Sequence, residues 1–287
     1  MKNGILVLNK PRGITSQRAV NAVRRSFNMK RVGHAGTLDP LAEGVLPVLL
    51  GTATRASEFL IEKDKRYRAR ILLGVTTDTL DMDGRILSRS DVSITQGDVE
   101  NALKQFLGEI EQIPPMYSAV SLGGQRLYSL ARKGIEVKRP CRKVTVYNAV
   151  LAEFSLPYIT IDVHCSKGTY IRTLADDLGK QLGCGGAVES LIRTKSGMFN
   201  IAQAIEMDSL SEDTPLIPTD KCFEEFEEIN LDKKSADRVK NGVPIFYPAA
   251  VLGKTFRVYD ENGIFTALME GDTEEERPCL RLIRGFY

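Results

Sequence analysis

The chain has little of what metal sites and disulfide frameworks need. Its 287 residues include no tryptophan, two histidines and five cysteines. The cysteine count is odd and no two cysteines form a Cys-x-x-Cys pair, which argues for a reducing compartment. Scattered cysteines and so few histidines do not offer the ligand spacing of a zinc site. We therefore expect neither a bound metal nor a disulfide framework.

Signals for nucleotide binding and for membranes are also missing. Neither Gly-x-Gly-x-x-Gly nor Gly-x-x-x-x-Gly-Lys-Ser/Thr occurs, so nothing suggests a nucleotide cofactor. No apolar run approaches the roughly 20 residues of a membrane helix. The first residues lack the small-residue cleavage site of a secretory signal. These absences predict a cytoplasmic protein that works without a cofactor.

The charges that are present are unevenly distributed, although the net charge is only +2. Residues 126–143 hold seven basic residues against one acidic residue, and residues 62–70 hold five against two. Residues 206–228 are instead rich in Asp and Glu. A basic face would suit a polyanion such as RNA. Solvated helix faces would give the same pattern, so charge alone leaves both interpretations open.

Hydrophobic periodicity predicts a mixed α+β fold without regular βαβ units. The predicted strands cover residues 5–8, 45–50, 67–73 and 158–165, and the predicted helices cover 15–27, 95–110 and 169–182. Residues 78–84 form a polar turn, and residues 209–221 read as a connector with two prolines. We expect a largely antiparallel sheet flanked by helices, followed by a small β-rich domain from about residue 229.

Four segments combine functional side chains with predicted strand ends or turns. In GHAGTLDPLAEGVLPV, Asp39 stands between turn-forming residues and an apolar run; an isolated Asp-Pro pair would be an ordinary turn. The other three are DKRYRARILLG with Tyr67, SKGTYIRTLADDLG with Tyr170 and Arg172, and LIRTKSGMF with Leu191 and Arg193. Side chains at such strand-to-helix turns are often functional.

Together with LNKPRGITS at residues 8–16, these segments resemble the TruB family of pseudouridine synthases over essentially the whole chain. The resemblance implies the pseudouridine synthase fold for a catalytic domain at residues 1–228, with a family-specific insertion at about 85–145. Residues 229–287 resemble a PUA domain, a small RNA-binding β-barrel. The implied reaction converts uridine-55 in the T-loop of tRNA to pseudouridine, with base flipping. The implied partner is the tRNA T-arm, with no obligatory protein partner and no cofactor.

The resemblance also implies roles for individual residues. Asp39 falls on the catalytic aspartate, Tyr67 and Tyr170 on active-site tyrosines, Arg172 on the arginine that pairs with the aspartate, and His34 and Leu191 on residues that touch the RNA or the target base. A guanidinium would keep a desolvated carboxylate ionised. Whether that carboxylate attacks the sugar, attacks the base or promotes elimination stays open. Tyr67 could stack on the base or act as a base itself.

Basic side chains near these motifs are candidates for phosphate contacts. They are Lys167, Arg193, Arg126, Arg132 and Lys133. Ser121 stands where the family usually has lysine, so one expected positive charge is missing. His34 could fill the space that a flipped base leaves, or be an ordinary hydrogen-bonded loop histidine.

Two other functions fit the same sequence. One is a subunit of an RNA-guided pseudouridine synthase, and the other is a non-catalytic tRNA-binding or folding protein. The lack of an extension before NGILVLNKP favours the stand-alone enzyme. A non-catalytic binder would not need Asp39, Tyr67 and Arg172 together.

Overall fold

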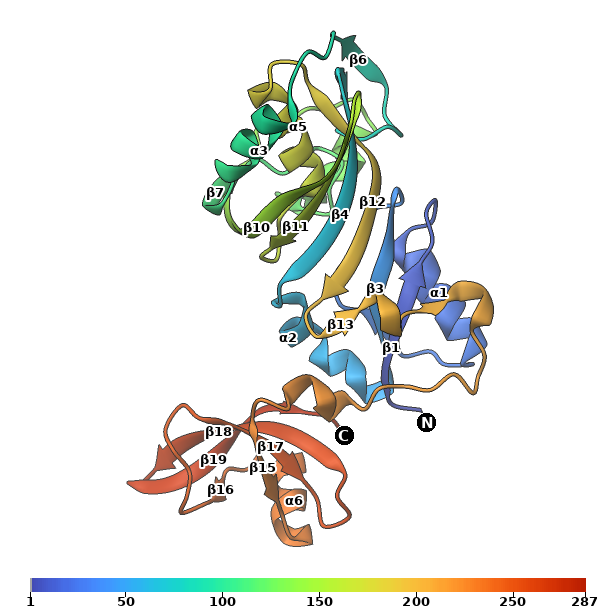
Figure 1. Ribbon diagram of the computed structural model, residues 1–287. Helices are drawn as coiled ribbons and strands as arrows, with labels where there is room; N and C mark the ends of the chain where they lie inside the picture. The colour runs from blue at the N-terminus through green and yellow to red at the C-terminus, as the bar shows by residue number, and fades with distance from the viewer. Residues whose placement is uncertain (1) are drawn as a thin grey trace.

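The computed structural model describes residues 2–287, which form a large mixed sheet in two lobes and a smaller C-terminal unit (Figure 1). The large sheet contains β1 (Gly4–Lys10), β2 (Val32–His34), β3 (Ala42–Leu50), β4 (Lys65–Leu73), β7 (Gly108–Gln112), β10 (Arg142–Ser155), β11 (Tyr158–Cys165), β12 (Gly186–Ser196), β13 (Phe199–Asn200) and β14 (Ile205–Glu206). The helices of this part are α1 (Ser16–Ser26), α2 (Ser57–Ile61), α3 (Gln96–Lys104), α4 (Leu127–Ala131) and α5 (Ile171–Gln181). Two small hairpins pair β5 (Val75–Thr77) with β6 (Ile86–Arg89) and β8 (Ser121–Leu122) with β9 (Gln125–Arg126).

The strand order of the large sheet is β14-β1-β3-β12-β4-β11-β10-β7, with β2 added to β3 and β13 added to β12. The pairs β1–β14 and β3–β12 are parallel, and the remaining pairs in this order are antiparallel. The expected α+β class with a largely antiparallel sheet is therefore confirmed. The β3–β12 pairing joins the two lobes, because β3 belongs to the N-terminal lobe and β12 is hydrogen-bonded to β4.

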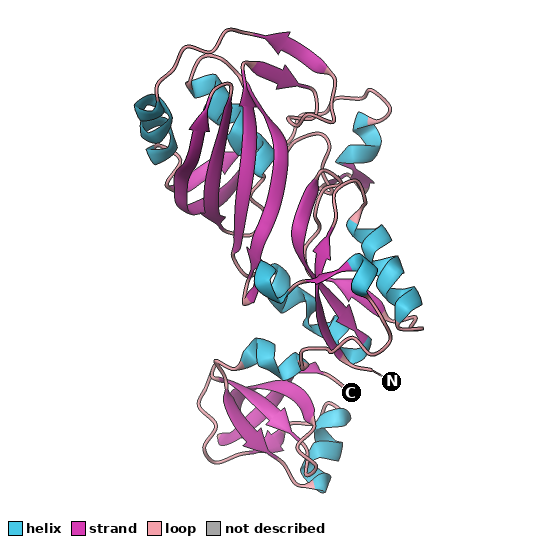
Figure 2. Ribbon diagram, turned by 45° about the vertical axis from the view of Figure 1, so that its right-hand side comes forward, coloured by secondary structure: helices cyan, strands magenta, loops and turns pink. Residues whose placement is uncertain are grey.

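Helices α1, α3 and α5 cover one face of this sheet. Val20 of α1, Val99 of α3 and Leu174 of α5 belong to one continuous apolar core with residues of the central strands. Strand β4 shows the underlying alternation, because Ala69 and Ile71 are buried on that face whereas Arg70 is exposed on the other. This arrangement places α1 and α5 on the same side of the sheet, toward opposite ends of it (Figures 1 and 2).

The helix predicted over 95–110 is shorter than expected. It begins with a capping box between Thr95 and Asp98 and ends at Lys104. Gly108 then adopts a φ of +90°, a value that redirects the chain, and Ile110 lies in β7, paired with Val144 of β10. The apolar spacing that predicted a longer helix includes Ile110, which packs on the same core from a strand.

The C-terminal unit is a curled five-stranded sheet that forms half of a barrel. Its strands are β15 (Glu227–Asn230), β16 (Ile245–Phe246), β17 (Thr255–Tyr259), β18 (Phe265–Glu274) and β19 (Arg277–Gly285), in the order β15-β17-β18-β19-β16, with helix α6 (Lys233–Lys240) packed on it. The sheet begins at Glu227, two residues before the division expected from the sequence.

The C-terminal unit shares an apolar cluster with the N-terminal lobe. Phe286 and Leu268 are buried in one cluster with Ile5 and Val7 of β1, and Phe223 lies between Phe59 and Phe286. Arg55 also donates to the carbonyl oxygen of Gly285 at 2.8 Å. The unit therefore packs firmly against the rest of the chain. Within residues 2–287, no helix is both long and apolar enough to cross a membrane.

Candidate active site

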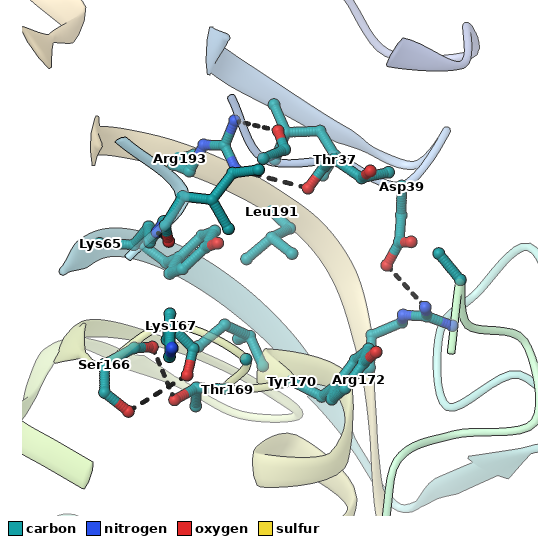
Figure 3. A pocket seen from close by; sticks show the side chains of 18 residues that line it. Thr37, Asp39, Lys65, Ser166, Lys167, Thr169, Tyr170, Arg172, Leu191 and Arg193 are labelled. Atoms are coloured by element: carbon teal, nitrogen blue, oxygen red, sulfur yellow. Dashed lines mark hydrogen bonds and ion pairs between the residues drawn. The ribbon is translucent and has the colours of Figure 1, made fainter. Parts of the chain in front are cut away.

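A cavity of about 240 Å³ opens between the loop that precedes β3 and the N-terminus of α5. Figure 3 shows Asp39 on the loop side pointing toward Arg172 on the helix side, with Leu191 of β12 in the wall between them. The lining residues come from the loop before β3, from α2, β4 and β12, and from the turn into α5; they include Thr37, Asp39, Ile61, Lys65, Tyr67, Lys167, Tyr170, Arg172, Leu191 and Arg193.

The charged centre of the cavity is an ion pair. Arg172 Nη2 lies 2.6 Å from Asp39 Oδ2; the arginine side chain is 3% exposed, whereas that of the aspartate is 34% exposed. The carboxylate therefore reaches the open cavity while its partner is held behind it. A buried guanidinium at this distance stabilises the ionised carboxylate.

Arg172 is held by the backbone of two loops and by a second carboxylate. It donates to the carbonyl oxygens of Thr79 at 3.0 Å and Tyr117 at 2.8 Å. Asp81 Oδ2 lies 3.4 Å from Arg172 Nη1. Burial raises the pKa of Asp81, and the Thr79 hydroxyl and the Arg172 charge oppose that rise. Sequence reasoning treated residues 78–84 as a plain polar turn and missed Asp81.

The loop that carries Asp39 is held from two sides. The Ser16 hydroxyl of α1 accepts from the Leu38 amide at 2.8 Å and donates to the Leu38 carbonyl oxygen at 3.0 Å. Arg193 donates to the carbonyl oxygens of Gly36 and Val45, at 3.0 and 2.7 Å, and more weakly to that of Thr37. Hydrogen bonds from Ser16 and Arg193 to the loop backbone therefore help to fix the position of Asp39, in addition to the contacts of its side chain.

The position of Arg193 corrects the expectation that it contacts RNA phosphate. Its side chain is only 1% exposed, and its three guanidinium nitrogens are occupied by backbone carbonyl oxygens of the loop and of β3. A buried arginine with these partners shapes the cavity wall.

Tyr67 and Lys65 lie side by side on the cavity face of β4, two residues apart. Burial raises the pKa of the Tyr67 phenol, and the Arg193 charge opposes this rise in part. Burial and the Arg193 charge lower the pKa of Lys65 to about 8. The Lys65 ammonium donates to the carbonyl oxygens of Ile61 and Lys63. Because the pKa of Tyr67 is raised, its side chain is a neutral phenol at neutral pH.

Tyr170 caps the N-terminus of α5 and is fixed through its backbone. Gln112 accepts from the Tyr170 amide at 3.0 Å and donates to its carbonyl oxygen at 3.3 Å. Burial raises the pKa of the Tyr170 phenol. Arg172 is the second residue of α5 after this cap. The cap therefore also fixes the position from which the Arg172 side chain projects.

Comparisons with known proteins point to one family. Residues 24–171 match the family model described as TruB family pseudouridylate synthase, N-terminal domain, and residues 172–224 match the tRNA pseudouridylate synthase B C-terminal domain. A tRNA pseudouridine synthase B of Clostridium kluyveri is 41% identical over 93% of this chain and 94% of its own length. The chain belongs to the TruB family of pseudouridine synthases.

Other relatives and solved structures agree with that assignment. The tRNA pseudouridine synthase B of a Pseudomonas aeruginosa strain is 42% identical over 99% of this chain and 96% of its own length. A chain of a solved Cbf5-Nop10-Gar1 complex superposes with a TM-score of 0.74 at 25% identity, covering 99% of this chain and 85% of that one. A chain from an H/ACA RNP bound to a substrate RNA containing 2′-deoxyuridine has a TM-score of 0.72 at 22% identity, which shows the same fold.

Lys167, a candidate phosphate contact, and His34, which the TruB resemblance assigns to an RNA contact, lie at different places relative to the cavity. Lys167 lies in its wall, is half-exposed and forms an ion pair with Glu62. His34 lies on β2 outside the lining residues, and burial followed by the Arg193 charge lowers its pKa. Its Nδ1 atom is buried without a hydrogen-bond partner among residues 2–287. His34 is therefore neutral at neutral pH.

The basic residues of the insertion stand at the surface. Arg126, Arg132 and Lys133 are all exposed, on β9 and just after α4. Arg126 reaches the carbonyl oxygen of Ala119, and Ala119 lines the cavity. Ser121 is exposed on β8, in the hairpin that leads to Arg126. The insertion thus carries its positive charge next to the cavity mouth.

Proposed function

We propose that this chain isomerises uridine-55 in the T-loop of tRNA to pseudouridine. The observation that carries the proposal is the Asp39 carboxylate, presented to a cavity by an almost fully buried Arg172, in a chain of the TruB family. The relatives named tRNA pseudouridine synthase B support tRNA as the substrate. A cavity of about 240 Å³ has room for one nucleotide base that has left its stack.

The reaction breaks the C1′–N1 bond, forms a C1′–C5 bond, and moves the C5 proton to N1, so no atom is gained or lost. Attack of a carboxylate on the sugar, attack on the base and carboxylate-promoted elimination all begin from an ionised Asp39. The buried Arg172 guanidinium pairs with the Asp39 carboxylate at 2.6 Å. A second carboxylate, that of Asp81, contacts the other terminal nitrogen of the Arg172 guanidinium.

Tyr67 serves best as a flat neutral partner of the uracil. Because burial raises its pKa, its deprotonation before the reaction would be costly. A neutral ring beside Leu191 can stack on the base and exclude water. Tyr170 forms the opposite wall next to Arg172.

The T-arm of tRNA is the proposed partner, and the chain acts without an obligatory protein partner. The solved relatives come from multi-protein complexes, whereas the relatives that match at about 40% identity are named as tRNA synthases. Exposed Arg126, Arg132 and Lys133 would contact phosphates near the cavity mouth. The C-terminal half-barrel would add RNA contacts farther from the target base.

The test uses purified protein alone with an unmodified tRNA transcript, followed by mapping of pseudouridine. We expect one new pseudouridine, at position 55, and none in a transcript with cytidine at that position. Product at another site would contradict the proposed substrate position. Absence of product unless other proteins are added would favour an RNA-guided subunit instead.

A further inference from the structure

The N-terminal segment is basic without any compensating acid. Residues 2–38 contain no Asp or Glu, and their basic residues are Lys2, Lys10, Arg12, Arg18, Arg24, Arg25, Lys30 and Arg31. The first carboxylate of the chain is Asp39 itself. This surplus of positive charge belongs to none of the basic segments assigned above.

Three of these side chains are free at the surface. Within residues 2–287, Arg18, Arg25 and Lys30 are exposed and take part in no ion pair or side-chain hydrogen bond. Arg24 and Arg31 differ, since they donate to the Val32 carbonyl oxygen and the Thr54 hydroxyl. Arg18 and Arg25 are two helical turns apart, so they lie on one face of α1 at a spacing of roughly 10 Å.

Helix α1 is also next to the reacting centre. Its first residue, Ser16, is hydrogen-bonded to both backbone groups of Leu38, the neighbour of Asp39. Val20 and Val23 of α1 share a core with Leu174 of α5, so the two helices flank the cavity on the same face of the sheet. The insertion lies beside α5, because Ala131 and Gly134 line a pocket together with Thr173 and Asp176 of α5. Helix α1 instead lies in the N-terminal lobe (Figure 1).

We propose that Arg18, Arg25 and Lys30, here called the α1 face, bind backbone phosphates of the RNA on the side of the cavity opposite the insertion. Flexible cations that lack carboxylate partners favour a polyanion and gain affinity by releasing its counterions. An RNA held from both sides would keep its target nucleotide over Asp39 while the base leaves the stack. This inference rests on the proposed function, because it takes the substrate to be RNA.

The experiment measures tRNA affinity against salt concentration for the double variant Arg18→Gln/Arg25→Gln. The matched control is Arg66→Gln/Arg70→Gln, which also removes two exposed arginines but from the opposite face of β4. We expect the α1 double variant to bind unmodified tRNA about tenfold more weakly at ~0.1 M salt and to flatten the log-affinity against log-salt slope by about 1.5 to 2 units. The control should change the slope by less than about half a unit.

Equal slopes for the two double variants would overturn the proposal, because the effect would then reflect net charge alone. If thermal melting shows that the α1 variant is unfolded, Arg18→Lys/Arg25→Lys keeps the charge and should keep the wild-type slope; a flattened slope there would also overturn it. At tRNA concentrations below saturation, pseudouridine formation by the α1 variant should fall in step with its affinity for tRNA; an unchanged rate there would overturn the proposal. A wild-type protein that makes no pseudouridine would contradict the proposed function separately, whatever the slopes show.

Discussion

Two buried arginines face the same cavity and hold it in different ways. Arg172 is 3% exposed and meets two carboxylates, Asp39 at 2.6 Å and Asp81 at 3.4 Å. Arg193 is 1% exposed and meets three backbone carbonyl oxygens, from Gly36, Thr37 and Val45. The first pairing holds the charged reacting group, and the second sets the shape of the loop that carries it.

The difference also appears in the groups around each arginine. The Arg172 charge is balanced by the carboxylates of Asp39 and Asp81. The Arg193 guanidinium donates to three backbone carbonyl oxygens, and its charge contributes, after burial, to lowering the pKa of both Lys65 and His34. A buried cation of this kind costs stability unless every donor is satisfied. We therefore expect substitutions at the two arginines to separate catalysis from folding.

The largest effect is expected at the carboxylate. Asp39→Asn keeps the size of the side chain but removes its charge, and should abolish detectable pseudouridine formation while tRNA affinity stays within a few-fold. Product mapping and a binding titration on the same preparation check this. Turnover near the wild-type rate would remove Asp39 from the mechanism.

Arg172→Lys should lower the rate of the chemical step by about 10²–10³-fold. A lysine keeps the positive charge but cannot serve Asp39, Asp81 and two carbonyl oxygens together. Single-turnover kinetics at saturating tRNA measure it. A normal rate would mean that bulk charge suffices.

Arg193→Lys should act mainly on stability. A lysine can satisfy fewer of the three carbonyl oxygens in this geometry, so we expect the free energy of unfolding to fall by about 2–4 kcal/mol. Urea denaturation followed by circular dichroism checks this value. An unchanged midpoint would show that the loop does not depend on Arg193.

Asp81→Asn should reduce the rate about tenfold, since one charged contact to Arg172 is lost while Asp39 remains paired. The measurement is again the single-turnover rate. A loss as large as that of Asp39→Asn would instead place Asp81 in direct contact with the reaction.

The smallest effect concerns pH. The pKa of Lys65 is lowered to about 8 in the folded chain, so between pH 8 and about 10.5 the unfolded state binds more protons and stability rises with pH. Relative to Lys65→Met, the wild-type free energy of unfolding should gain about 2 kcal/mol across this window. Urea titrations of both proteins at pH 8 and 10 measure it; a constant difference would contradict the lowered pKa.

Much of the fold follows from local sequence patterns. Alternation at residues 158–165 and 67–73 predicted β11 and β4, and the helix predicted over 15–27 corresponds to α1. The helix predicted over 95–110 was wrong beyond Lys104. A helical apolar stripe and a strand residue that packs on the same core give similar spacing over a few residues.

The site was less accessible to local reasoning. Asp81 contacts Arg172 across 91 positions of sequence, and nothing in its own turn marks it as buried. Arg193 was expected at the RNA because a basic side chain near a site is usually exposed; its partners lie about 150 positions earlier in the chain. The assembly of these contacts depends on the β3–β12 pairing, which no single segment specifies.

The most direct test compares Arg172→Lys with Arg193→Lys in one experiment: single-turnover pseudouridine formation at saturating tRNA, with each rate corrected for the folded fraction. We expect a rate reduced by about 10²–10³-fold for Arg172→Lys and within about tenfold of wild type for Arg193→Lys. Equal corrected rates for the two variants, or a larger loss for Arg193→Lys, would contradict the division between an arginine that pairs with the reacting carboxylate and one that shapes its loop.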